Sequence, residues 1–249
     1  PQKHGASYQE KNKLIKDIYL NYATKVVFQS QYSKAQCFKL FGEKDTDDYE
    51  IIINGVNEAI FYPSNILTKS PKTFKFVTTG NFRNLDMLEP VIKALDAISK
   101  FDFELNIIGP IVNDKLHDLI NRDYINHLGS KDSHQIADLL REHHIFMYSH
   151  LNPPCPNSVL EAIASGLPVV GFNSGSMSEL LHFSQNLLAE VSDDVFQKYE
   201  DFSADALKEK IIYCMTHFEK MKGISLVNAS NYSFKHCGKQ YQKIFQNIG

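Results

Sequence analysis

Several features that would place a protein in a specialised class are scarce or missing from this sequence. No apolar run approaches the roughly 18 to 20 residues that a membrane-spanning helix needs, and the first residues, PQKHGASYQEKNK, contain no apolar signal core. Basic residues are not in excess, since 26 Lys and Arg oppose 29 Asp and Glu, whereas duplex-binding proteins normally carry a clear basic surplus. We therefore expect a cytoplasmic protein without a transmembrane segment that does not bind nucleic acid.

Cysteine is also scarce, and its spacing argues against a disulfide scaffold. The four residues Cys37, Cys155, Cys214 and Cys237 are scattered and form no CxxC pair, so reduced thiols and no metal site are expected. Nucleophile-elbow and zinc-type spacings are missing too. The chain opens at Pro1, without a methionine and directly before a helical pattern, which indicates a fragment of a longer protein.

What the sequence does contain is an alternation of short apolar runs and helical patterns. The runs are bounded by Gly, Pro, Asn or Ser, as strands are, and lie at 25–30, 49–53, 74–79, 103–108, 124–128, 145–149 and 167–172. Between the later runs, apolar residues recur at helical spacing, for example Leu88, Val91, Ile92 and Leu95. Repeated strand-helix-strand units predict an α/β fold, namely a doubly wound, mostly parallel sheet with helices on both faces.

A polar segment, EKDTDDYE at 43–50, indicates a domain boundary. Residues 1–48 would then be the end of an N-terminal domain whose larger part is missing. Residues 49–230 would form one α/β domain, and residues 231–249 would form a C-terminal helix.

Ligands of open parallel sheets bind outside the carboxyl ends of the strands, so the loops after the strands are the candidate site. Five glycines lie in or beside these loops: Gly80, Gly109, Gly129, Gly171 and Gly175. Glycine lets the backbone approach a ligand closely, although for each one alone a simple turn after a strand is the favoured interpretation.

The stretch LNPPCPNSVLEAIASGLPVV at 151–170 is the most informative. Pro156 and Asn157 lie at the start of a helix that Gly166 ends, which is where each residue type is favoured. The free N–H groups around Ser158 and Val159 would face the carboxyl edge of the sheet as an anion site. A pyrophosphate would fit there.

Glu161, one turn into this helix, has two readings. Its two carboxylate oxygens suit a vicinal diol such as the O2′ and O3′ hydroxyls of ribose. The letters SVLE also match a capping box, in which Ser158 caps the helix and Glu161 reaches back. Spacing alone leaves both readings open.

The sequence PNSVLEAIASGLPVVGFNSGSMSELL at 156–181 resembles the signature of the retaining GT-B glycosyltransferases, often called group one. KVVFQSQYSKAQCFKLFG resembles the last strand and helix of the family's acceptor domain, and IIINGVNEAIFYP its interdomain segment. FKFVTTGNFRNLDMLEPVIKAL, LNIIGP and HLGSKDSHQIADLLREHHIFMYS resemble the remaining donor-domain blocks in order. NYSFKHCGKQYQKIF resembles the final helix, which packs back toward the acceptor domain.

This resemblance implies two Rossmann-like domains and transfer of a sugar, with retention and without an active-site metal, from a nucleotide diphosphate sugar. The acceptor would be a glycan, lipid or protein in polysaccharide or glycoconjugate biosynthesis, and a lipid-linked acceptor could hold the enzyme at a membrane periphery. The implied donor-site residues are Glu161 for the ribose, the Ser158 and Val159 N–H groups for the phosphates, Gly129 and Ser130 for the base wall, and Gly175 with Glu179 near the end of the pocket. Asn157 at the helix start and Gly80 in the first strand-end loop are further donor-site candidates, taken from the sequence pattern itself.

Three positions depart from the family pattern. The usual first glutamate, eight positions before Glu161, is Pro153, and the usual phosphate-binding Arg and Lys are Asn81 and Asp86. Arg83 is the nearest replacement cation, because its guanidinium could bind a diphosphate through a fork of donors. Lys131 is a weaker candidate.

Some polar residues have local explanations. Asp86 is expected to cap the helix beginning near Leu88. His143 and His144 are expected at a solvated helix end, whereas His150 follows a strand and could touch the donor.

No residue is identified as a general base, so the catalytic residues are left unassigned. Two alternatives to a transferase are a sugar-nucleotide epimerase of the same architecture and a non-catalytic module that binds sugar nucleotides. The departures at Pro153, Asn81 and Asp86 favour the second.

Overall fold

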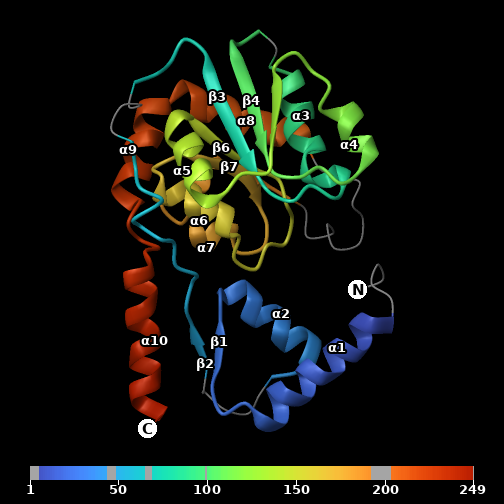
Figure 1. The fold of residues 1–249 in the computed structure, drawn as a ribbon, viewed down its shortest axis with the longest axis vertical. Coiled ribbons are helices and arrows are strands. Elements are labelled where there is room, and N and C mark those ends of the chain that lie inside the picture. Colours follow the sequence, from blue (N-terminus) through green and yellow to red (C-terminus); the bar gives the residue numbers. More distant parts are fainter. Residues whose placement is uncertain (1–5, 44–48, 65–68, 99, 192–202, 249) are drawn as a thin grey trace.

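The computed structural model describes residues 6–43, 49–64, 69–98, 100–191 and 203–248, which form two lobes (Figure 1). The large lobe, residues 69–230, holds a six-stranded sheet with helices on both faces. The small lobe, residues 6–51, holds two helices and a two-stranded sheet. The chain passes between the lobes at residues 52–64 and again where α10 leaves the large lobe and runs beside the small one.

The sheet of the large lobe has the order β5-β4-β3-β6-β7-β8, and every neighbouring pair is parallel. Its strands are β3 (Phe74–Thr79), β4 (Phe103–Ile108), β5 (Ile125–Gly129), β6 (Ile145–Tyr148), β7 (Val169–Asn173) and β8 (Leu188–Glu190). Strands are added in one direction after β3 and in the other after β6, so the topological switch point lies between β3 and β6. The predicted doubly wound α/β fold is confirmed.

The helices of the large lobe are α3 (Glu89–Asp96), α4 (Asp114–Leu119), α5 (Ser133–Glu142), α6 (Asn157–Ala164), α7 (Met177–Leu180), α8 (Ala204–Thr216) and α9 (Phe218–Asn228), with 3₁₀ turns η2 (Leu85–Met87) and η3 (Gln185–Leu187). Apolar residues on α3 and α5 repeat at helical spacing, which gives each helix one buried stripe and one polar face.

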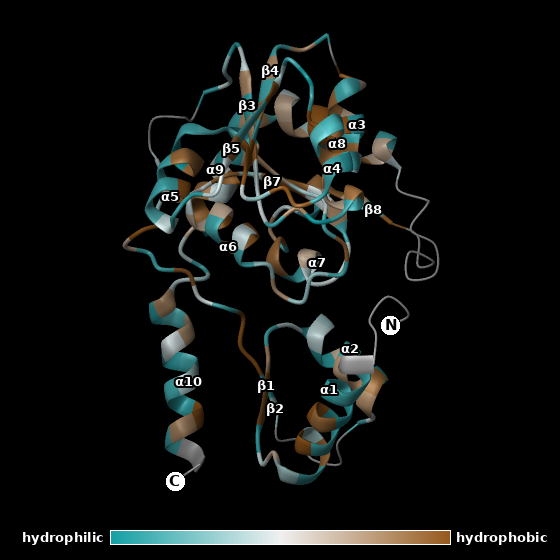
Figure 2. Cartoon of the chain, turned by 45° about the vertical axis from the view of Figure 1, so that its right-hand side comes forward, coloured by the Kyte–Doolittle hydropathy of each residue, from teal (hydrophilic) through white to brown (hydrophobic). Residues whose placement is uncertain are grey.

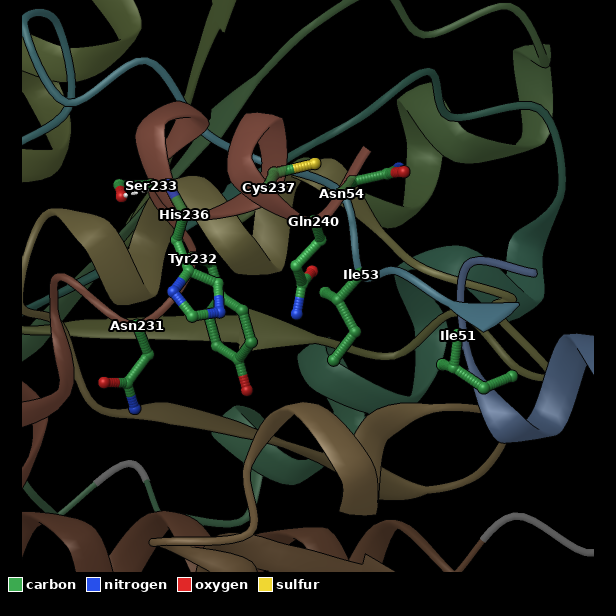
Figure 3. A pocket seen from close by; sticks show the side chains of 9 residues that line it. All are labelled: Ile51, Ile53, Asn54, Asn231, Tyr232, Ser233, His236, Cys237 and Gln240. Carbon is green, nitrogen blue, oxygen red and sulfur yellow. Dashed lines mark hydrogen bonds between the residues drawn. The ribbon is translucent and has the colours of Figure 1, made fainter. Parts of the chain in front are cut away.

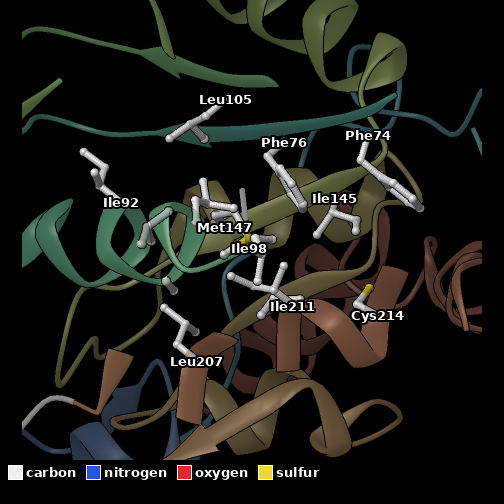
Figure 4. Packing of buried hydrophobic residues seen from close by; sticks show 14 of the residues in the cluster. Phe74, Phe76, Ile92, Ile98, Leu105, Ile145, Met147, Leu207, Ile211 and Cys214 are labelled. Carbon is white, nitrogen blue, oxygen red and sulfur yellow. The ribbon is translucent and has the colours of Figure 1, made fainter. Parts of the chain in front are cut away.

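Two hydrophobic clusters occupy the two faces of the sheet. Successive residues of β3 belong to different clusters, because side chains alternate along a strand: Phe76 packs under α3 and α8, and Val77 packs under α5 and α6. Figure 4 shows the first cluster, in which Phe76, Ile145 and Ile211 meet beneath the sheet. Figure 2 shows the hydrophobic residues along the strands and polar residues on the outer helix surfaces.

The small lobe comprises α1 (Ala6–Asp17), a π-helical turn η1 (Ile18–Tyr22), β1 (Val26–Phe28), α2 (Gln31–Phe41) and β2 (Tyr49–Ile51). β1 and β2 pair in parallel. α10 (Phe234–Ile248) follows the large lobe. The predicted boundary at residue 48 falls in residues 44–48, outside the described residues, and β2 just after it joins the sheet of the small lobe rather than that of the large one.

One strand was not predicted. β8 has three residues, LAE, and pairs with β7 at the sheet edge. A segment this short contains no complete alternation of apolar and polar residues, so its strand character depends on the neighbour that it pairs with.

Candidate functional site

β3 and β4 are each followed at the carboxyl end by a loop that begins with glycine, and the two loops are in direct contact. The Gly80 N–H donates to the Ile108 carbonyl at 3.0 Å, and the Gly109 N–H donates to the Gly129 carbonyl at 2.8 Å. Gly109 has a φ of 127°, and a Cβ added to it would lie 1.8 Å from the Gly80 oxygen. Only glycine fits at Gly109, so the two loops form one close-packed floor at the edge of the sheet.

α6 begins at Asn157, and its N-cap is Pro156, which has no side chain that could cap it. The capping-box reading of Ser158 and Glu161 is therefore wrong: both lie inside the helix, and no side-chain cap bond is made there. The Val159 N–H donates to the Pro156 carbonyl at 3.1 Å. Asn157 and Ser158 are the first two residues of the helix, where N–H groups have no intrahelical carbonyl to bind.

Glu161 lies on the wall of a pocket of about 430 Å³. The pocket is lined by Ser133, Asn157 and Glu161 from the large lobe, by Asn54, Gly55, Val56, Asn57, Ile60 and Phe61 from the connection between the lobes, and by Phe234 from α10. Burial raises the pKa of the Glu161 carboxyl to about 7. Its oxygens are not used by a cap and are available to a ligand in the pocket.

Eight of the ten residues that line the pocket were not predicted as site residues, among them Ser133 and Asn54. Ser133 is the first residue of α5, and Asn54 belongs to the connection. The Asn54 side-chain amide donates to the Asn157 side-chain oxygen at 2.8 Å, which ties the connection to the start of α6. The Asn-Gly-Val segment was assigned only to the connection between domains, and nothing local to it indicates that it folds back onto α6.

Arg83 and Asn81 lie together on the loop after β3, and both are exposed. The Arg83 Nε donates to the Asn81 side-chain oxygen at 3.4 Å. Asn81, which stands where the family commonly has an arginine, thus contacts Arg83, the nearest cation. The predicted cap role of Asp86 is wrong, because α3 has Leu88 as its N-cap without a side-chain bond and Asp86 lies in η2.

The remaining predicted residues lie at different places along the edge. Gly129 is the last residue of β5, and Ser130 and Lys131 follow it with exposed side chains. Gly175 has a φ of 61°. Glu179 does not line the pocket: its carboxylate accepts hydrogen bonds from the start of α2 in the small lobe.

A second cavity, of about 120 Å³, lies between the connection and α10 (Figure 3). Figure 3 shows Tyr232, His236 and Gln240 on one side of it and Ile53 on another. Asn54 lines both cavities. None of the predicted site residues lines this smaller one.

His143 and His144 are buried, so the prediction of a solvated helix end is wrong. The His144 N–H donates to the Lys75 carbonyl at 2.9 Å, and His144 Nδ1 accepts from the Lys75 N–H at 3.0 Å. Burial lowers the pKa of His144 to about 4. Phe218, distant in sequence, covers this histidine at a ring separation of 5.7 Å.

His150 follows β6 at the carboxyl edge and is partly buried. Its ring lies 4.9 Å from that of Tyr148 and 6.1 Å from that of Phe82. Burial lowers the pKa of His150, so the imidazole is neutral at physiological pH.

All four cysteines are free thiols. Within the described residues, no group of three or more His, Cys, Asp or Glu side chains is arranged to hold a metal ion. No helix in the same part of the chain is long and apolar enough to cross a membrane.

The chain belongs to the family Glycosyl transferases group 1, whose model matches residues 73–216. The match covers the sheet from β3 through β8 together with α6, so the family resemblance of the α6 segment is confirmed. No curated protein matches the sequence significantly.

Solved structures share the fold at low sequence identity. Sucrose-phosphate synthase from Thermosynechococcus elongatus is 16% identical with a TM-score of 0.75, and the match covers 96% of this chain and 62% of that one. A glycosyltransferase from Rickettsia africae is 19% identical, with a TM-score of 0.74 and coverage of 98% and 68%. HepE from Anabaena, solved with UDP and glucose, is 16% identical, with a TM-score of 0.79 and coverage of 99% and 69%. The chain therefore spans about two thirds of the length of these proteins.

Proposed function

We propose that this chain binds a nucleotide diphosphate sugar and takes part in transfer of the sugar to an acceptor, with retention of configuration and without an active-site metal. The observation that carries the proposal is the partly buried Glu161 carboxyl, which borders a pocket of about 430 Å³ at the start of α6. Family membership supports the reaction class, and the neighbour HepE was solved with UDP and glucose.

In this proposal the nucleoside half of the donor occupies the pocket. The Glu161 oxygens bind the two ribose hydroxyls, a pairing that suits a carboxylate because each oxygen accepts one bond. Ser133, Gly129 and Ser130 border the base. Because burial raises the pKa of Glu161 to about 7, the ionised form that accepts both hydroxyls is reached at neutral to basic pH.

The pyrophosphate lies at the first turn of α6. The Asn157 and Ser158 N–H groups have no intrahelical acceptor there, and the helix dipole favours negative charge. Arg83, an exposed cation on the neighbouring loop, adds charge-assisted bonds, and Lys131 is a second candidate. These groups stabilise the charge that develops on the leaving nucleotide diphosphate, which is the main catalytic demand of such a transfer.

We further propose that the small lobe is the end of an acceptor domain. Its surface exposes several large apolar side chains, namely Leu14, Ile15, Ile18, Tyr22 and Leu40. Exposed apolar side chains of this size are typical of a face that packs against further protein, and about a third of the length of the structural neighbours lies outside the match with this chain.

The nucleotide site is tested by thermal unfolding of the chain with UDP, GDP and ADP. A ligand present at 100 times its Kd and bound only by the folded state adds about 2.7 kcal/mol, so the matching nucleotide should raise the Tm by several degrees. Glu161→Ala should remove most of this rise. Glu209→Ala, an exposed glutamate on α8, is the matched control and should leave it intact.

If no nucleotide raises the Tm, the proposed site is refuted. If one does, incubation of the chain with nucleotide sugars and a panel of acceptors separates a transferase from a non-catalytic binding module. The departure at Pro153 favours the module, and donor left intact with every acceptor would support it. Formation of a product whose anomeric configuration matches that of the donor, read by NMR, supports retention.

A further inference from the structure

The start of α2 in the small lobe points at the edge of the large lobe and is held there by Glu179. The Gln31 N–H donates to Glu179 Oε2 at 2.7 Å, and the Tyr32 N–H donates to Oε1 at 2.8 Å. The two donors are 148 and 147 residues from Glu179 in sequence. Both carboxylate oxygens therefore cap a helix that belongs to the other lobe.

Ser30 adds a third hydrogen bond across the same contact. Its hydroxyl accepts from the Ser33 N–H at 2.9 Å in a capping box and donates to the Pro154 carbonyl at 2.5 Å. Ser30 is fully buried. The Ser30 hydroxyl thus caps α2 within the small lobe and at the same time bonds to the large lobe.

The loops of the large lobe that receive α2 are fastened to each other. The Ser176 N–H donates to the Pro153 carbonyl at 2.9 Å, and the Asn152 N–H donates to the Ser174 hydroxyl oxygen at 2.9 Å. A Cβ on Gly175 would lie 2.5 Å from Pro153 atoms. The loop after β6 and the loop before α7 are therefore held together by hydrogen bonds and close packing.

We infer that Glu179 is a positioning residue which holds the small lobe against the large lobe and thereby sets the relative orientation of the two lobes. We call the contact of Ser30, Gln31 and Tyr32 with Pro154 and Glu179 the clasp. Two charge-assisted bonds at a helix N-terminus are among the stronger polar contacts available at a surface. At Pro153, the position of the family's usual first glutamate, the backbone carbonyl accepts from the Ser176 N–H, and the Pro154 carbonyl accepts from the Ser30 hydroxyl.

The clasp is tested by amide hydrogen exchange and small-angle X-ray scattering on the whole chain. Glu179→Ala should speed exchange of the Gln31 and Tyr32 amides about tenfold, since both lose a charged acceptor at a helix N-terminus. It should also enlarge the radius of gyration. Glu179→Gln keeps one acceptor oxygen and should restore part of the protection.

Ser203→Ala is the matched control, because Ser203 caps α8 inside the large lobe through the Ala206 N–H at 3.0 Å. This variant should lose stability like any uncapped helix but leave the Gln31 and Tyr32 amides and the radius of gyration unchanged. Unchanged exchange of both amides in Glu179→Ala would overturn the inference. Equal effects of the Glu179 and Ser203 variants on the two amides would do so as well.

The consequence for ligand binding rests on the proposed function. If UDP, GDP or ADP raises the Tm of the unaltered chain, Glu179→Ala should weaken the affinity for that nucleotide several-fold, although Glu179 does not line the pocket. If the affinity is unchanged while the radius of gyration grows, the clasp affects only the orientation of the lobes, and its link to the nucleotide site is overturned. If no nucleotide binds, the proposed function fails, whereas the exchange result still decides the clasp.

Discussion

The two ends of the parallel sheet both bury ionisable side chains, but they surround them differently. At the amino end, the His144 ring lies 6.0 Å from that of Phe74 and 5.7 Å from that of Phe218, and Lys222 is buried as well. At the carboxyl end, Glu161 borders a pocket of about 430 Å³ that polar and apolar side chains line together.

Burial shifts the pKa at both ends. It lowers the pKa of His144 to about 4 and that of Lys222 to about 8, and it raises the pKa of Glu161 to about 7. A shifted pKa alone therefore does not distinguish a packed core from a binding site. The distinguishing features of Glu161 are the open space that it borders and the N–H groups of the first turn of α6 beside it, whereas neither His144 nor Lys222 lines that pocket or the smaller cavity.

The largest effect is expected in the core between the two ends. Phe76 is completely buried where β3, β4 and β6 meet, so Phe76→Ala should lower the free energy of unfolding by about 3–5 kcal/mol. Chemical denaturation measures this loss. A loss below about 1 kcal/mol would contradict the packing described for this cluster.

An intermediate effect is expected at the amino end, with the opposite sign. Lys222 is 2% exposed, and its folded pKa of about 8 lies below its ordinary 10.5. Below pH 8, burial of the Lys222 charge destabilises the folded state to its full extent. This destabilisation disappears as the pH rises from 8 to 10.5, because Lys222 loses its proton at a lower pH in the folded state than in the unfolded state. Lys222→Met should therefore add about 1–3 kcal/mol at pH 7 and much less at pH 10.5.

Chemical denaturation at both pH values tests this expectation. A Met variant that is less stable than the unaltered chain at pH 7 would show that Lys222 has a favourable partner in the core. An equal gain at pH 7 and pH 10.5 would show that the gain arises from packing and not from the charge.

The smallest expected effect is a difference between the two ends in how their contribution to stability depends on pH. His144 has a folded pKa below its ordinary value, so its contribution to stability is present above pH 6.5 and is lost as the pH falls toward 4. Glu161 has a folded pKa above its ordinary value, so its contribution is present below pH 4.5 and is lost as the pH rises toward 7.

The stability that His144→Gln and Glu161→Gln gain relative to the unaltered chain should therefore change with pH in opposite directions. The His144 variant gains as the pH falls from 6.5 to 4. The Glu161 variant gains as it rises from 4.5 to 7, by about 1–2 kcal/mol after allowance for solvent screening of a partly exposed group. Unfolding free energies at pH 4, 5.5 and 7 measure both slopes, and parallel slopes would contradict the contrast.

Much of the large lobe could be predicted from local patterns. β3 and β4 have the predicted bounds, and α6 starts and ends where Pro156 and Gly166 indicate. These elements are set by residues within a few positions of one another, through apolar periodicity and helix-end preferences. The capping box at Ser158 failed because a short motif cannot say which residue is the first of the helix.

The sequence by itself determined an α/β sheet, the edge at which a ligand would bind, and the α6 segment that identifies the family. Only the tertiary structure decided that Asn54 folds onto the pocket, that His144 is covered by Phe218, and that Glu179 caps a helix of the other lobe. Each of these contacts joins residues roughly 70 to 150 positions apart, and they form because the sheet order brings strand ends and connections together. Local periodicity contains no information about contacts between residues so far apart in sequence. The sequence alone therefore could not show that Glu161 borders the pocket whereas Glu179 belongs to the clasp.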